Sequence, residues 1–179
     1  MPGARGLSFV ELLVTLVIAT IVGGYALGIF TTLVAGNRQT GTINNVVTSL
    51  LMARSHAITH HEYVLVCPSS DGVRCDNTRE WHHGWLVRAA PTAADVLDNA
   101  ALHTALRTHQ AAPSLTMLAN RDYFLFRPFA RRATNGTLVF CPDLASVPGK
   151  AIIISYTGRP RVARHLSDGR PVPCAMDSG

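Results

Sequence analysis

A long uncharged stretch near the start of the chain constrains the fold more than any other feature. Residues 12–37 contain no Asp, Glu, Lys or Arg, and most of their side chains are apolar. A helix needs about 20 apolar residues to cross the hydrocarbon core of a bilayer, so residues 12–35 are long enough to span one. Glu11 lies at the edge of this stretch, although a carboxylate within a spanning helix costs about 2.5 to 3.5 kcal/mol near its middle. We therefore expect Glu11 to have a partner.

The length and flanks of the apolar stretch distinguish between kinds of targeting segment. A secretory signal peptide has a shorter apolar region, of about 7 to 15 residues, that ends in a small-residue cleavage site. Here the apolar run is longer and Gly6 precedes it, which argues against a signal peptide, while a simple uncleaved anchor leaves Glu11 unexplained. Because Arg5 precedes the span, the positive-inside rule predicts a cytoplasmic amino terminus and an exported segment after Gly36.

The sequence GLSFVE at residues 6–11 resembles the class III signal of type IV pilins and pseudopilins. The resemblance implies that a prepilin peptidase cleaves between Gly6 and Leu7 and methylates the new amino terminus on Leu7. It also implies that Glu11 acts in assembly, because its charge can pair with the terminal ammonium of a neighbouring subunit in an apolar bundle. Leu7 departs from the Phe that is common at this position. The expected organisation is a leader peptide at 1–6, a transmembrane and filament-core helix at 7–35, and a periplasmic pilin domain at 36–179.

The first part of the exported segment has the hydrophobic pattern of a helix. Between residues 41 and 59, apolar residues recur at intervals of three and four, which is the spacing of one helical face. These residues are Ile43, Val46, Val47, Leu50, Leu51, Ala57 and Ile58. The spanning helix is therefore expected to continue to about residue 60, with an apolar stripe against a domain.

After His61 the pattern changes to short apolar and β-branched runs, separated by Gly, Pro, Asp and Asn. Such runs predict strands of antiparallel sheets. The predicted strands are 63–67, 84–87, 115–119, 123–127, 137–141 and 151–157, whereas 95–107 fits either a helix or a strand. Together with the resemblance to type IV pilins, these patterns predict an α+β fold of the type IV pilin kind, with a long N-terminal α-helix packed on a C-terminal antiparallel β-sheet domain.

Four cysteines lie in the segment that we expect outside the cytoplasm, where disulfides form. They allow three pairings, of which we favour Cys67 with Cys75 and Cys141 with Cys174. The first pair closes a short loop and the second ties the tail to a strand, and each contributes about 2 to 4 kcal/mol through loop closure. Zinc binding is the competing use of cysteine, but neither spacing resembles a short zinc knuckle. We expect no metal and no cofactor.

The net charge of +5 is concentrated in one part of the chain. Residues 121–170 contain nine basic and three acidic side chains, which gives this segment a net charge of +6. The basic residues are Arg121, Arg127, Arg131, Arg132, Lys150, Arg159, Arg161, Arg164 and Arg170. A basic region in an exported domain can bind a polyanion or acidic lipid head groups, or can serve solubility alone.

Several motifs in the strand-rich part resemble the GspH/FimT family of minor pilins and pseudopilins. The motifs are VLVCP at 64–68, Trp81 followed by Gly84 and Trp85, NGTLVFC at 135–141, IIS at 153–155 and GRPR at 158–161. By this resemblance, some members are subunits of type II secretion pseudopili and some prime type IV pilus assembly. FimT-like members bind DNA during natural transformation through the arginines of a Gly-Arg-x-Arg stretch.

The GRPR stretch has local properties that suit phosphate binding. Two residues of extended chain advance about 6.6 Å and leave alternate side chains on one face, so Arg159 and Arg161 can contact neighbouring phosphates. Pro160 fixes φ between them, and Gly158 permits the turn that ends the preceding strand. The alternative is a solvated turn whose arginines have no ligand. The expected DNA-binding residues are Arg159, Arg161 and Arg164, with Arg131, Arg132 and Lys150 as secondary contacts.

Other candidate sites in the sequence are weaker. The adjacent pairs His60-His61 and His82-His83 are expected to diverge on strands, and no spacing typical of a metal site occurs. No nucleophile-elbow motif or glycine-rich phosphate loop is present, so we do not expect an enzyme. Trp81 and Trp85 fit core packing better than base stacking.

The sequence therefore predicts a minor pilin of the inner membrane, with a single span and its C-terminal domain in the periplasm before it joins a pilus at the cell surface. Its expected partners are double-stranded DNA, bound without sequence preference, other major and minor pilins, and prepilin peptidase. The alternative within the family is a priming pilin or secretion pseudopilin whose basic segment contacts another subunit. A membrane-anchored periplasmic enzyme is the alternative from a different class.

Overall fold

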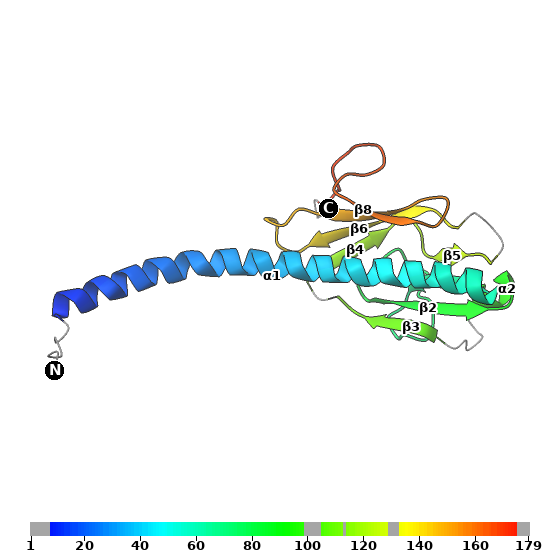
Figure 1. The fold of residues 1–179 in the computed structure, drawn as a ribbon, viewed down its shortest axis with the longest axis horizontal. Coiled ribbons are helices and arrows are strands. Elements are labelled where there is room, and N and C mark those ends of the chain that lie inside the picture. The colour runs from blue at the N-terminus through cyan, green and yellow to red at the C-terminus, as the bar shows by residue number, and fades with distance from the viewer. Residues whose placement is uncertain (1–7, 99–104, 113, 129–132, 175–179) are drawn as a thin grey trace.

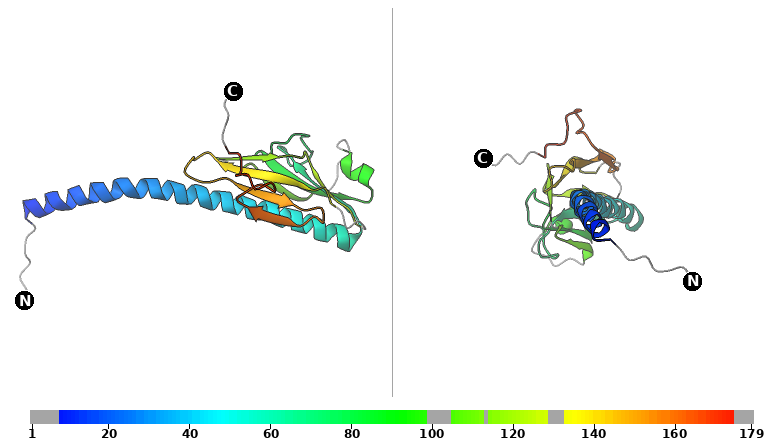
Figure 2. Two further views of the ribbon diagram at one scale, coloured as in Figure 1. Left: turned by 90° about the horizontal axis from the view of Figure 1, so that it is seen from above. Right: turned by 90° about the vertical axis from the view of Figure 1, so that its left-hand side faces the viewer.

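A long helix and two antiparallel sheets make up the protein (Figure 1). The structure is a computed structural model that describes residues 8–98, 105–112, 114–128 and 133–174. Helix α1 extends over Phe9–His60, a length of about 78 Å at 1.5 Å per residue. Its first half projects away from the sheets and its second half lies against them, and Figure 2 shows that the helix is curved.

The two sheets each have four strands, in the orders β3-β2-β1-β5 and β4-β6-β7-β8, and all their pairings are antiparallel. We call them sheet A and sheet B. Sheet A is built from β1 (Tyr63–Pro68), β2 (Gly84–Ala90), β3 (Ala105–Gln110) and β5 (Phe124–Phe126). Sheet B is built from β4 (Leu115–Ala119), β6 (Gly136–Pro142), β7 (Lys150–Ile154) and β8 (Pro160–Ala163). A short helix, α2 (Ala93–Leu97), follows β2.

The main core lies between α1 and the two sheets. The helix buries residues spaced by three and four, which are Ile43, Val46, Leu50, Ala53 and Ala57. Leu51 and Ile58, which the sequence also assigns to the apolar stripe, are about half exposed, at 48% and 53%. Both follow a buried position by one residue, so the helical rotation of about 100° per residue carries them off the stripe.

Strand β1 is buried on both faces. Val64 and Val66 point into the main core, whereas Leu65 and Cys67 join a second, smaller apolar cluster that includes Val96 of α2. A strand between two apolar layers shows a continuous apolar run instead of alternation. This explains the run of Val, Leu and Val that begins at residue 64.

Three segments differ from their predicted structure. In the segment 95–107, which fitted either a helix or a strand, residues 95–97 belong to α2 and residues 105–107 to β3. The strand predicted at 151–157 ends at Ile154. Strand β8 was not predicted, because it is a four-residue edge strand that begins with proline and lacks an apolar pattern.

The projecting half of α1 is apolar and exposed. It is long and apolar enough to cross a membrane, and none of this stretch is buried against the rest of the protein. The exposed large side chains include Phe9, Leu16, Ile21 and Phe30. An exposed apolar surface of this size requires a lipid or protein environment.

Candidate nucleic-acid interface

The GRPR stretch forms the turn between β7 and β8 and the start of β8. The backbone N–H of Ser155 donates to the carbonyl of Arg159 (3.1 Å), and that of Gly158 donates to the carbonyl of Ser155 (2.8 Å). The Ser155 hydroxyl also accepts a hydrogen bond from the N–H of Arg159 (3.2 Å). Three hydrogen bonds therefore fix the backbone from which the Arg159 side chain projects.

Gly158 is required at this turn for two separate reasons. Its φ is +73°, in the left-handed region that side chains with a Cβ adopt at a cost. A Cβ at this position would lie 2.9 Å from the Cβ of Ala133 and 3.0 Å from the ring of Phe126. The glycine thus lets the turn pack closely on sheet A and on the segment that follows β5.

The three arginines that sequence analysis assigns to DNA are exposed on this turn and strand. Arg161 lies in β8 opposite Ile153 of β7, and Arg159 and Arg164 flank the strand. Within the described parts of the chain, no carboxylate forms an ion pair with any of the three guanidinium groups. All three side chains are exposed, on and beside the edge strand β8 of sheet B.

Two other basic residues of the segment, Lys150 and Arg170, make polar contacts with neighbouring side chains. The Lys150 ammonium donates to the Thr40 hydroxyl of α1 at 3.1 Å, so it is held against the helix. Arg170 forms an ion pair with Asp168 at 2.6 Å, and this contact lowers the pKa of the Asp168 carboxyl. These contacts hold Lys150 and Arg170 in place, whereas Arg159, Arg161 and Arg164 have no carboxylate partner among the described residues.

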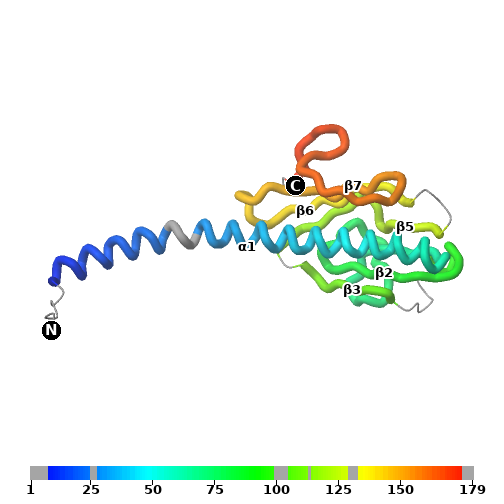
Figure 3. The backbone as a smooth tube through the Cα atoms, viewed as in Figure 1, coloured from blue at the N-terminus to red at the C-terminus, as the bar shows by residue number. Residues whose placement is uncertain are grey.

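Two disulfides join the same cysteines that we paired from the sequence. Cys67 is bonded to Cys75, eight residues later, and Cys141 of β6 is bonded to Cys174. The chain after β8 projects from sheet B as a loop and returns to it (Figure 3), and the second disulfide anchors that return. Arg164 lies at the start of this anchored segment.

Some predicted site residues lie outside the described residues, namely Gly6, Leu7, Arg131 and Arg132. Glu11 is described, and it lies in the first turn of α1 with its side chain exposed. Trp81 and Trp85 are both buried in the main core, as favoured from the sequence. Their indole N–H groups donate to the Arg121 carbonyl (3.4 Å) and the Ser49 hydroxyl (3.1 Å), so neither ring is available to stack on a base.

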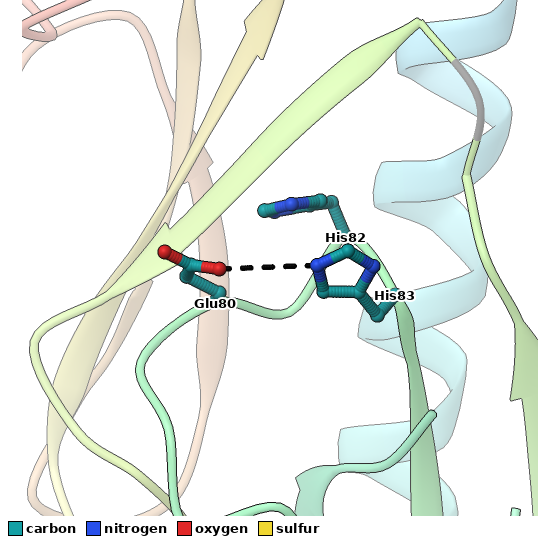
Figure 4. A group of neighbouring side chains, drawn as sticks. All are labelled: Glu80, His82 and His83. Atoms are coloured by element: carbon teal, nitrogen blue, oxygen red, sulfur yellow. Dashed lines mark ion pairs between the residues drawn. The ribbon is translucent and has the colours of Figure 1, made fainter. Parts of the chain in front are cut away.

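The expectation that the adjacent histidines diverge on strands was wrong. His60 is the last residue of α1 and stacks on His56, with ring centroids 4.1 Å apart. His82 and His83 lie in the turn before β2, and their ring centroids are 4.2 Å apart. Glu80 faces His83 in the same turn (Figure 4), with 3.8 Å between its Oε2 and the His83 Nε2. The sequence feature that could have indicated this cluster of side chains is the run Glu-Trp-His-His before a glycine, at residues 80–84.

The fold defines a pilin-like protein: a long helix with an exposed apolar N-terminal half, whose second half packs on antiparallel sheets. Two crystal structures of the type IV minor pilin FimU from Pseudomonas aeruginosa strain PAO1 share this fold, each with 18% sequence identity. The first gives a TM-score of 0.55 and covers 77% of this chain and 96% of that one. The second gives 0.53 and covers 75% and 98%. No curated protein sequence matches the chain.

The family described as type II transport protein GspH matches residues 42–158, which is more than half of the chain. The protein therefore belongs to the GspH family, and it is a GspH/FimT-like minor pilin or pseudopilin. The matched region includes both sheets up to the β7–β8 turn and ends at Gly158.

Proposed function

We propose that this minor pilin binds extracellular DNA and delivers it for uptake in natural transformation. The observation that carries the proposal is the group of three exposed arginines, Arg159, Arg161 and Arg164, none of which pairs with a carboxylate in the described chain. Arginine suits phosphate because its planar guanidinium donates two parallel hydrogen bonds to one anion.

The local backbone supports contacts to successive phosphates. Arg159 and Arg161 are separated by one residue, so their Cα atoms are about 6.6 Å apart along extended chain, close to the spacing of neighbouring phosphates in a strand. The hydrogen bonds to Ser155 and the fixed φ of Pro160 reduce the entropy that binding would cost. Phosphate contacts carry no base information, so we expect double-stranded DNA to bind without sequence preference.

The proposal includes a route from the membrane to the filament. Prepilin peptidase would remove residues 1–6 and methylate Leu7, and the helix from 7 to 35 would hold the subunit in the inner membrane with residues 36–179 in the periplasm. During assembly, Glu11 would pair with the amino terminus of a neighbouring pilin. The exposed apolar half of α1 supports this part of the proposal, since a filament core would cover it.

The salt dependence of DNA binding tests the proposed interface. With the full chain in detergent micelles, log affinity for duplex DNA should fall against log salt with a slope of about −4 to −5, as expected when four to six phosphates are neutralised. Replacing both Arg159 and Arg161 with Gln should flatten the slope by about 2. Scrambled DNA sequences should bind almost equally.

A matched variant removes the same charge elsewhere. Arg74 and Arg79 are exposed in the loop between β1 and β2, and the residue after Arg79 bridges to β4, which is the opposite edge of sheet B from β8. The Arg74→Gln/Arg79→Gln variant should keep the wild-type slope to within about one unit. Equal slopes for the Arg159/Arg161 variant and wild type would rule out this interface.

The second candidate is a priming pilin or a secretion pseudopilin, with the basic strand against another subunit. The observation that favours it is the description of the matching family as a type II transport protein. The same variant separates the two functions in cells. Loss of transformation with normal pili supports DNA capture, whereas loss of pili or of secretion supports the second candidate.

A further inference from the structure

The turn before β2 gathers three side chains that can each provide a metal ligand (Figure 4). Glu80, His82 and His83 offer one carboxylate oxygen and two imidazole nitrogens, all within 4.8 Å of one another. Glu80 and His83 are exposed and His82 is half-buried. The cluster lies in the segment between β1 and β2, where Glu80 bridges to Leu118 of β4, at the opposite edge of sheet B from β8.

The backbone that carries these side chains is fixed on both sides. Trp81, which is fully buried, donates its N–H to the Met117 carbonyl of β4 at 2.8 Å, and the Ala119 N–H donates to the Arg79 carbonyl at 2.9 Å. The carbonyl of His82 accepts from the Ala112 N–H at 3.0 Å. These contacts fix the backbone of the turn before any ligand binds, which lowers the ordering cost of binding.

His82 provides a second observation. Its Nδ1 atom is buried without a hydrogen-bond partner among the described residues. Most buried side-chain nitrogens have such a partner, and in the tautomer that protonates Nε2 the Nδ1 lone pair of His82 can bind a metal ion. The neighbouring Glu80 oxygen and His83 nitrogen lie 3.8 Å apart, near the separation of about 3.4 Å that two ligands have around a tetrahedral zinc ion.

We propose that Glu80, His82 and His83 form a site for a divalent transition-metal ion, with zinc as its expected occupant. Two imidazoles and one carboxylate suit Zn²⁺, which three protein ligands hold with a fourth position open. The exposed Glu80 and His83 side chains can rotate to complete the coordination of the ion. His82 is half-buried, and its backbone is held by the hydrogen bond from Ala112. The ion braces the start of β2 in sheet A against the chain that is bonded to β4 of sheet B.

Zinc titration of the full chain in detergent micelles tests the site. After removal of metal with a chelator, wild type should bind one Zn²⁺ per chain in competition with a chromophoric chelator, and zinc should raise the Tm. Glu80→Gln and His83→Gln should each weaken binding about tenfold or more, since even loss of a residue that only orients a ligand costs about 10- to 100-fold. Both residues are exposed, so these variants should fold as wild type does.

A second histidine pair supplies the control. His60 and His61 are adjacent at the end of α1, and the His60→Gln/His61→Gln variant removes two imidazoles without touching the proposed site. This variant should keep wild-type zinc affinity and the zinc-dependent rise in Tm. The proposal is overturned if wild type shows no saturable zinc binding, if Glu80→Gln and His83→Gln bind as tightly as wild type, or if the control variant loses affinity equally.

Discussion

The indole nitrogen of Trp85 donates a hydrogen bond to the hydroxyl of Ser49 across 3.1 Å, and both side chains are buried. The Ser49 hydroxyl in turn donates to the carbonyl of Asn45, one helical turn earlier, at 2.9 Å. This chain of bonds joins β2 of sheet A to α1 within the main core. The Trp85 indole N–H and the Ser49 hydroxyl therefore both have hydrogen-bond partners within a core that is otherwise apolar.

The Ser49→Ala substitution should lower the free energy of unfolding by about 1 to 3 kcal/mol, because it leaves the buried Trp85 N–H without an acceptor. Thr48→Ala is the matched control, since Thr48 is the exposed neighbour on the same helix and should change stability by about 0.5 kcal/mol at most. Denaturant unfolding in detergent, followed by tryptophan fluorescence, measures both. Equal effects of the two substitutions would contradict a structural role for this hydrogen bond.

Gly158→Ala should destabilise the fold more than Gly169→Ala. Both glycines have positive φ, +73° and +84°, so each substitution carries the left-handed backbone penalty of about 1 to 2 kcal/mol. Only at Gly158 would the new Cβ also collide, with Ala133 and Phe126, whereas nothing lies within 4 Å at Gly169. The difference in Tm between the two variants measures the steric part of the destabilisation. A larger loss of Tm for Gly169→Ala would contradict the close packing of Gly158 against Ala133 and Phe126.

His109 should make the protein less stable as the pH falls. Desolvation, and then the positive charge of Arg107, lower the pKa of His109 below its ordinary value. Its ring stacks on Trp85, with centroids 4.4 Å apart, and its Nε2 accepts a hydrogen bond from Arg107 Nε at 2.8 Å. The folded chain therefore binds this proton less readily than the unfolded chain, so the stability present above about pH 6.5 is lost as the pH falls from there toward the folded pKa.

Denaturant unfolding at several pH values between about 7.5 and 5.5 checks this sign. His109→Gln should show a smaller loss of stability over that range than wild type, because its side chain does not titrate. Direct titration of the His109 ring by NMR should place its pKa below that of a model histidine. A raised value, or an unchanged pH dependence in the variant, would contradict the prediction.

Removal of the Cys141–Cys174 disulfide should lower stability and weaken DNA binding. The bond closes a segment of sequence separation 33, for which loop-closure entropy corresponds to about 3.7 kcal/mol, against about 2.5 kcal/mol for the separation of 8 at Cys67–Cys75. Replacing both residues of each bond by Ser compares the two by denaturant unfolding. Only the Cys141/Cys174 variant should also reduce DNA affinity, because it releases the segment that begins at Arg164; equal affinity in both variants argues against that coupling.

Mass spectrometry of the mature protein should find Leu7 as an N-methylated first residue. Gly6→Val should leave the precursor uncut, because the expected cleavage lies between these two residues. Glu11→Gln is a useful companion, since it should leave cleavage intact while impairing assembly into filaments. A mature terminus beyond about residue 20, as a conventional signal peptidase would leave after an apolar region of about 7 to 15 residues, would refute the proposed processing.

Local patterns in the sequence were enough to predict the main elements of the fold. Three local patterns predicted them: the apolar stretch after Glu11, the helical spacing from Ile43 to Ala57, and the β-branched runs. Each pattern lies within a short segment, where the spacing and type of apolar residues distinguish a helix from a strand. The two disulfides could also be proposed, since export and loop length limit the pairings. Family motifs then identified the arrangement of helix and sheets.

Tertiary contacts decided which of the predicted residues can act together. The ammonium of Lys150 donates to the Thr40 hydroxyl, 110 residues away in sequence, so α1 sets its position, which the basic composition did not show. Strand β8 has no strand pattern in its own sequence, and it forms by antiparallel pairing with β7. The turn that carries Glu80, His82 and His83 is held by the hydrogen bond from the Trp81 N–H to the Met117 carbonyl of β4. Sequence periodicity reports interactions within a few residues, whereas these arrangements depend on contacts between segments that only the folded chain brings together.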